Sequence, residues 1–269
     1  MTSTPDVAAS VRGMAMEWLS HEQYLDHAAA HARQAAELAQ GADLGAAVPS
    51  CPDWALRDLL FHTGMVYRWI GETVGRKAAE RVPFREVPDR EMPEGGEAAW
   101  LLAGAERTVA LLREAGPDVA VWGWAHGGGT RWWGRRIAHE SLVHRIDAEL
   151  TVGVRPEADA ALAADNIDEL LTNASDFDAR AFTSRGELAG AGDSLHLHCT
   201  DVPGEWQLRR TAEAFTLEYG HAKADAAVRG SARDVMLWLN GRLPQGEPGP
   251  EQFGEERVPQ LWRAGLSLT

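Results

Sequence analysis

The spacing of apolar residues changes from a helical to a strand period along this chain. Through roughly the first 180 residues, apolar side chains recur three and four positions apart, which predicts amphipathic helices. Beyond Gly190, segments such as 195–200 alternate strictly between apolar and polar residues, which predicts strands. We therefore predict an α+β protein, with a helical domain over residues 1–184 and a small α+β domain with an antiparallel sheet over residues 185–269.

The boundaries of most elements can also be predicted. Ser20 and Gln23 form a plausible capping box for the first helix, and Gly41 ends it. We expect helices at residues 22–40, 54–76, 97–115, 135–150 and 157–176 in the first domain. In the second domain we expect strands at residues 195–200, 205–210, 214–219 and 224–229, and a helix capped by Ser231.

Composition narrows the class of function. The chain has 26 Lys and Arg against 40 Asp and Glu, a formal charge of −14, which argues against nucleic acid or an anionic membrane as a partner. We see neither a signal peptide nor an apolar run long enough to span a membrane, and no feature implies a protein partner. Cys51 and Cys199 lie far apart, which indicates free thiols. We therefore predict a cytoplasmic protein that acts on small molecules.

The predicted helix at residues 135–150 carries a candidate metal-binding pair. Glu140 and His144 are four residues apart and share one helical face, so they can bind one ion if another helix supplies a third ligand. His139 lies on the apolar stripe with Leu142 and Ile146, and we predict that it is structural. The alternative is an exposed helix in which Glu140 and His144 only contact each other.

Other histidines compete for the third position. His62 lies on the shoulder of the apolar face of helix 54–76, where it is either a ligand or a hydrogen-bonded core residue. His27 and His31 are also four residues apart and form a rival pair. His196 and His198 share the polar face of a predicted strand, and we expect both to face solvent.

A segment rich in tryptophan and glycine, residues 122–133, precedes the metal-binding helix. It contains no phosphate-binding glycine motif. Its tryptophans could line a cavity, and we predict that Trp124, His126 and Trp132 contribute to cofactor binding. The alternative is a loop whose tryptophans fill the core.

Three groups of motifs resemble the mycothiol-dependent maleylpyruvate isomerase family. The first runs from Val48-Pro49-Ser50-Cys51-Pro52-Asp53-Trp54 through Leu59-Leu60-Phe61-His62 to Trp69. The second is Arg135-Arg136-x-x-His139-Glu140-x-x-x-His144-Arg145-x-Asp147-Ala148-Glu149. The third comprises Asp201-x-x-Gly204-x-Trp206, Val228-Arg229-Gly230-Ser231 and Leu237-Trp238-Leu239-Asn240-Gly241-Arg242. In this order, the motifs cover nearly the whole chain.

The resemblance implies a DinB-like four-helix bundle that holds one divalent metal ion, usually zinc, in its interior. By the same resemblance, the ligands are His62, Glu140 and His144, and the cosubstrate is mycothiol, bound to the metal as a thiolate. The isomerases are expected to use an arginine of the C-terminal domain near the substrate carboxylates. Arg242 is our first candidate for this catalytic role, and Arg229 the second.

Two activities and one non-catalytic role fit these motifs. We favour a mycothiol-dependent S-transferase that attacks a small electrophile, because the Trp- and Gly-rich segment is larger and more aromatic than a small dicarboxylate requires. The first alternative is maleylpyruvate cis–trans isomerisation. The second is a non-catalytic metal-containing binding or regulatory protein, because fold alone does not decide function.

Overall fold

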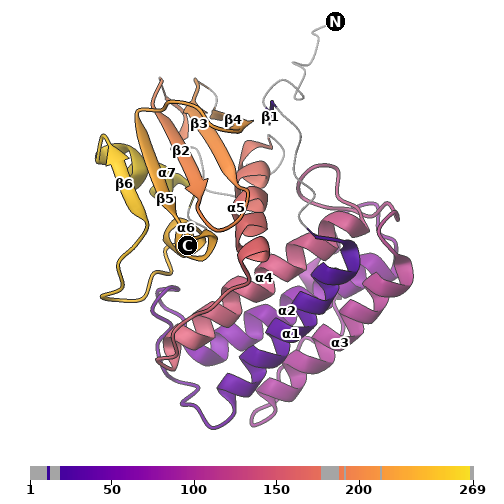
Figure 1. Cartoon of the computed structure of the whole chain (residues 1–269). Coiled ribbons are helices and arrows are strands. Elements are labelled where there is room, and N and C mark those ends of the chain that lie inside the picture. The colour runs from indigo at the N-terminus through magenta and orange to yellow at the C-terminus, as the bar shows by residue number, and fades with distance from the viewer. Residues whose placement is uncertain (1–10, 13–18, 177–187, 191, 213, 267–269) are drawn as a thin grey trace, which may run out of the picture. The chain divides into compact units, whose positions relative to one another are not determined.

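The chain folds into two compact units in this computed structural model (Figure 1). The structure describes residues 11–12, 19–176, 188–190, 192–212 and 214–266. One unit contains residues 19–157, and the other combines residues 158–268 with the N-terminal segment up to Trp18. The predicted boundary at residue 184 lies within 177–187, outside the described residues. Helix α5 (Ala160–Ser175) belongs to the second unit, where it packs with helix α6 (Ala232–Leu239).

Four long helices form the first unit, as predicted (Figure 1). They are α1 (His21–Ala39), α2 (Leu56–Gly75), α3 (Glu97–Ala115) and α4 (Thr130–Thr151). Helix α1 packs chiefly against α4, and α2 packs chiefly against α3. A short 3-10 helix, η2 (Phe84–Glu86), lies in the connection between α2 and α3. We refer to this unit as the bundle.

Local signals in the sequence account for the ends and the core of these helices. Ser20 caps α1 through the predicted capping box with Gln23, and Gly41 adopts a φ of 81° just beyond its end. Tyr67 of α2 is buried. Its hydroxyl donates to the carbonyl of Ala28 in α1 at 2.8 Å and lies 2.6 Å from Ser141 Oγ of α4. This hydroxyl ties three helices together near the candidate site on α4.

The second unit is built on a mixed six-stranded sheet with the order β1-β4-β3-β2-β5-β6. Its strands are β1 (Val11–Arg12), β2 (Ser194–Cys199), β3 (Glu205–Arg210), β4 (Phe215–Tyr219), β5 (Ala226–Gly230) and β6 (Glu251–Gly254). Helix α6 begins after Ser231, whose side chain accepts from Asp234 N as predicted, and α7 (Arg257–Leu266) follows β6. We refer to this unit as the sheet unit.

The predicted antiparallel sheet requires a correction. Strands β2, β3 and β4 do pair in antiparallel fashion, but β5 pairs in parallel with β2, and β1 in parallel with β4. Alternation identifies a strand but not its neighbour. The chain crosses over from β4 to place β5 beside β2. Strand β5 therefore runs parallel to β2, and does not form an antiparallel hairpin with β4.

The two faces of this sheet differ less in side-chain burial than the sequence suggests. Leu197, Trp206 and Leu208 are fully buried on one face, and Trp206 Nε1 donates to Asp168 of α5 at 3.0 Å. On the other face His198 is half-buried, but His196 is only 5% exposed. The prediction that His196 faces solvent is therefore wrong, because side chains from β3 and from the segment after β4 surround it.

No helix in the described ranges is both long enough and apolar enough to cross a membrane.

Candidate metal centre

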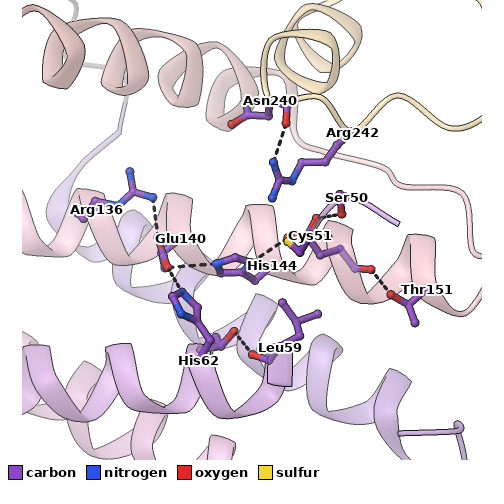
Figure 2. Close-up of polar contacts among 12 residues, drawn as sticks. Ser50, Cys51, Leu59, His62, Arg136, Glu140, His144, Thr151, Asn240 and Arg242 are labelled. Carbon is purple, nitrogen blue, oxygen red and sulfur yellow. Dashed lines mark hydrogen bonds and ion pairs between the residues drawn. The ribbon is translucent and has the colours of Figure 1, made fainter. Parts of the chain in front are cut away.

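The bundle brings His62, Glu140 and His144 together, as the motifs imply (Figure 2). His62 comes from α2, and the other two come from adjacent turns of α4. Glu140 Oε1 lies 3.0 Å from His62 Nε2 and 3.2 Å from His144 Nε2. One nitrogen or oxygen atom from each residue lies within 4.8 Å of the other two.

These separations suit a divalent ion of the zinc type. Zinc binds imidazole nitrogen and carboxylate oxygen at about 2.0–2.1 Å, so two ligands of a tetrahedral site lie about 3.3 Å apart. The contacts of Glu140 with His62 and His144 are close to that value. Three protein donors leave one position for an exogenous group, which is the usual composition of a catalytic site. The donor set therefore fits the ion that the resemblance implies.

Asp147 orients one of the two imidazoles. Its Oδ2 lies 2.8 Å from His144 Nδ1, so it can accept the proton on Nδ1 and direct Nε2 toward Glu140. Asp147 is completely buried, and its carboxylate also accepts hydrogen bonds from Ser50 Oγ and, at 3.6 Å, from Cys51 Sγ. The segment before α2 is thus connected to the candidate metal centre through one carboxylate.

Arg136 supports the carboxylate of Glu140. Its Nη2 donates to Glu140 Oε2 at 3.1 Å, while Oε1 faces the two imidazoles. Burial alone would raise the pKa of the Glu140 carboxyl, but hydrogen bonds with His144 and His62 and the charge of Arg136 hold this pKa well below its usual range. The Glu140 carboxyl is therefore an anion at neutral pH.

The pKa of His144 shifts in the opposite direction to that of Glu140. Burial disfavours its charged form, yet hydrogen bonds with Asp147 and Glu140 outweigh burial and raise the pKa of His144 to about 9. Its imidazolium can bridge the two carboxylates, with one proton directed at each. A metal ion at Nε2 would take the place of the proton directed at Glu140.

A cavity of about 780 Å³ opens beside His62. Its apolar wall includes Trp54 and Phe61, and its charged lining consists of Arg85 and Arg90 together with Asp53 and Asp58. Trp54 packs against both imidazoles, with ring centroids 4.8 Å from His62 and 6.2 Å from His144. The candidate centre thus borders a space large enough for a small ligand.

The two predicted catalytic arginines lie in the sheet unit. Arg242 is buried after α6, and its Nη1 donates to the carbonyl of Asn240 at 2.6 Å (Figure 2). Arg229 of β5 forms an ion pair with Glu251 of β6 at 3.2 Å. Both of these contacts are made within the sheet unit, and the catalytic role of the two arginines stays a prediction.

The tryptophans of residues 122–133 pack on one another and on Trp69 of α2. Trp124 and Trp132 meet edge to face with centroids 5.0 Å apart, and Trp132 lies 4.5 Å from the buried Trp133. Trp133 therefore fills the core, whereas Trp124 and Trp132 are only half-buried. Trp132 precedes Glu140 by more than two helical turns, about 12 Å along the axis of α4. His126 is exposed in the loop, and the cofactor-binding role of these residues stays a prediction.

The remaining histidines of the bundle are less suited to a metal ion. His139 is fully buried beside Tyr24, with ring centroids 6.0 Å apart, which agrees with the predicted apolar stripe. His27 and His31 stack at 5.8 Å, and His31 Nδ1 contacts Gln34 Oε1 at 3.3 Å. In the described part of the chain, this pair is not among the groups of three or more potential ligands.

Sequence reasoning missed several supporting residues. Asp147 lies three residues after His144, and Arg136 lies four residues before Glu140, so helical spacing alone places both beside the ligands. Trp54 had no comparable signal, because its contact with the imidazoles depends on how the segment before α2 folds back. Of the arginines that line the cavity, Arg85 lies in the short helix η2 and Arg90 follows it, and the sequence does not indicate the position of η2.

Comparisons with known proteins point to the same family as the motifs. Residues 24–149 match the family model described as the mycothiol maleylpyruvate isomerase N-terminal domain. A search of curated protein sequences gives no match. A crystal structure of the mycothiol-dependent maleylpyruvate isomerase matches with a TM-score of 0.57 and 16% identity, covering 91% of this chain and 99% of that one.

A histidine-to-alanine mutant of that isomerase matches with the same TM-score and coverage at 15% identity. At such identities the structural likeness shows the fold, which extends over both units. The family model adds the sequence evidence for the helical part of the chain. The resemblance indicated by the motifs is confirmed for the helical part of the chain, where residues 24–149 match the mycothiol maleylpyruvate isomerase N-terminal domain.

Proposed function

We propose that this protein is a metal- and mycothiol-dependent enzyme of the maleylpyruvate isomerase type. The observation that carries the proposal is the convergence of His62, Glu140 and His144 beside a cavity, with a donor set that leaves one position open. A divalent ion held by these three side chains would supply positive charge that lowers the pKa of the mycothiol thiol.

The chain's own residues have distinct tasks in this proposal. Asp147 holds His144 in the tautomer that presents Nε2, and Arg136 holds Glu140 with one oxygen toward the imidazoles. The ring of Trp54 is tilted against His62 and stacked on His144, so it would limit the approach of water from that side. The reacting groups would therefore meet next to a preorganised cluster.

The cavity also offers groups for a dicarboxylate substrate. Arg85 and Arg90 line it together with His62, and a guanidinium pairs well with a carboxylate. In the proposed reaction the thiolate adds to the substrate double bond, the resulting single bond rotates, and elimination returns the thiol with the trans product. Arg85 and Arg90 would hold the carboxylates during the rotation, as candidates additional to Arg242 and Arg229.

Isomerisation now has better support than the S-transfer that we favoured from the sequence. The family model and the similar structures both carry the isomerase description. The argument for S-transfer was the size of the Trp- and Gly-rich segment, but Trp132 and Trp133 pack on each other and Trp133 is buried. Those side chains therefore do not support a large electrophile-binding pocket.

Dependence on mycothiol tests the proposal directly. Purified protein loaded with zinc should isomerise maleylpyruvate when mycothiol is added in catalytic amounts, with conversion followed by NMR. An S-transferase would consume one equivalent of thiol per product. Binding of mycothiol without any turnover would support a non-catalytic protein, and turnover without thiol would refute the mechanism.

The chain's own thiols provide the control. Burial raises the pKa of the Cys199 thiol to about 12, so it is not an anion at neutral pH. Cys51 contacts Asp147, and serine can donate the same hydrogen bond. Cys51→Ser should therefore keep mycothiol-dependent turnover. Loss of turnover in this variant, with its metal content unchanged, would indicate that an internal thiol takes part.

A further inference from the structure

A second cluster of potential metal ligands lies in the sheet unit. His196 and His198 of β2, Glu205 of β3 and His221, which follows β4, each offer a ligand atom within 4.8 Å of the others. All four residues belong to the sheet unit, so the cluster is separate in sequence and in fold from the bundle centre.

The carboxylate of Glu205 is the common neighbour of the three imidazoles. Its Oε1 lies 3.1 Å from His198 Nδ1, and its Oε2 lies 3.3 Å from His196 Nε2 and 3.1 Å from His221 Nδ1. These values are close to the roughly 3.3 Å that separates two ligands of a tetrahedral zinc ion. The ring centroids of His196 and His221 are 4.9 Å apart, so the imidazoles themselves converge.

One ligand atom in this cluster is buried without a hydrogen bond. His196 is 5% exposed, and its Nε2 has no hydrogen-bond partner among the described residues, although Glu205 Oε2 lies only 3.3 Å away. A buried polar atom without a partner carries a free-energy cost. A cation placed among these four side chains would remove that cost by bonding to the nitrogen directly.

The sheet holds the ligands in fixed positions. His196 and His198 are two residues apart on one strand and so point to the same face. Glu205 lies directly opposite His198 in the antiparallel pairing of β2 with β3. Among the nearby cations, Arg229 lies opposite His198 on β5, and its charge is paired with Glu251. Three of the four donors therefore lie on hydrogen-bonded strands, and His221 alone lies beyond a strand end.

We propose that His196, His198, Glu205 and His221 form a second, structural zinc site. Three imidazoles and one carboxylate complete a four-coordinate shell, which leaves no position for substrate and is typical of zinc that stabilises a fold. The ion would join β2, β3 and the segment after β4 on the sheet face opposite to Trp206. It would have no part in the activation of thiol.

Metal content in the full-length chain tests this inference. A double variant, His62→Ala with His144→Ala, removes two ligands of the bundle centre and leaves the sheet cluster intact. After zinc loading and desalting, elemental analysis should find about two equivalents in the wild type and about one in this variant. Cobalt substituted into the variant should give the intense visible absorption of a tetrahedral ion. Absence of bound metal from the folded double variant would overturn the inference.

Variants of the sheet cluster provide a second test of the proposed zinc site. His198→Ala, added to the double variant, should reduce the bound metal to below about a tenth of an equivalent. The matched control is Glu218→Gln, which removes a carboxylate from the same sheet face, opposite Gln207, without touching the cluster. Full metal retention in the His198→Ala protein would overturn the inference, as would equal loss in the Glu218→Gln control.

If His198→Ala prevents folding, the effect of zinc on the thermal stability of the double variant tests the sheet site. Its thermal midpoint should rise on addition of zinc and fall on addition of a chelator. An unchanged midpoint would count against the site. A wild type that binds one ion, lost with His62 and His144, would support the bundle centre and reject the sheet site, so the two proposals fail separately.

Discussion

The bundle and the sheet unit gather the same kinds of side chain in different ways. In the bundle, two ligands one turn apart on α4 meet one from α2, and the supporting carboxylate of Asp147 lies outside the cluster. In the sheet unit, neighbouring strands contribute the donors, and the carboxylate of Glu205 lies among them. Three converging donors leave room for a reactant, whereas four close the shell. If both proposals hold, donor count, set by backbone geometry, separates the reactive site from the structural one.

Removal of a bundle ligand should produce the largest effect. In His144→Ala we expect metal affinity at the bundle centre to fall by more than about 100-fold and mycothiol-dependent turnover to fall with it, because a zinc ion retains only two protein donors. Isothermal titration with zinc and initial rates would measure both. The sheet cluster should keep its ion, so a loss of all metal would mean that the two regions are not independent.

A change to the supporting carboxylate should have an intermediate effect. Asp147→Asn weakens the hydrogen bond with His144 Nδ1, and loss of such support typically costs about 10- to 100-fold in metal affinity or activity. Ser50→Ala removes only one partner of Asp147 and should cost less. Zinc affinity would be measured by competition with a chelator. An unchanged affinity in Asp147→Asn would show that Asp147 does not support metal binding.

The metal-free protein should show opposite pH responses in the two regions. Because the pKa of His144 is raised to about 9, its stabilisation is complete below about pH 6.5 and is lost as the pH rises toward 9, by about 3 kcal/mol at most. Burial lowers the pKa of His196, so its contribution is instead lost as the pH falls below about 6.5. Urea unfolding of wild type and His144→Gln between pH 6 and 9 would reveal the first effect, and an equal slope in both proteins would contradict it.

The smallest expected effect separates the two groups of tryptophans. Trp54→Ala removes the ring that packs on His62 and His144, and we expect mycothiol affinity to fall by about 2- to 10-fold. Trp132→Phe should leave mycothiol affinity unchanged, because Trp132 packs on Trp124 and Trp133. The reverse result, measured from the dependence of the initial rate on thiol concentration, would restore the cofactor role predicted for Trp132.

Local signals allowed much of the bundle to be predicted from the sequence. The capping box at Ser20 set the beginning of α1, and the spacing of Glu140 and His144 placed both on one face of α4. The family motif added His62, whose approach from α2 is a long-range contact that periodicity does not contain. The prediction succeeded where neighbours in sequence are also neighbours in space.

Long-range pairing accounts for what the sequence did not reveal. The direction of β5 depends on its pairing with β2, and alternation carries no information about partners. The burial of His196 depends on Glu205 and His221, which arrive from other parts of the chain. The ring of Trp54 and the arginines Arg85 and Arg90 reach the cavity through loops whose course depends on tertiary packing.

The shared carboxylate of Asp147 has a thermodynamic consequence for the segment before α2. Ser50, Cys51 and His144 all contact it, so occupation of the bundle centre and the docking of that segment are linked equilibria. Linkage is reciprocal: whatever factor the ion contributes to holding the segment in place, the segment contributes to retention of the ion. An alkylated Cys51 would thus lower zinc affinity without touching a ligand, and bound zinc would slow alkylation of Cys51 in turn.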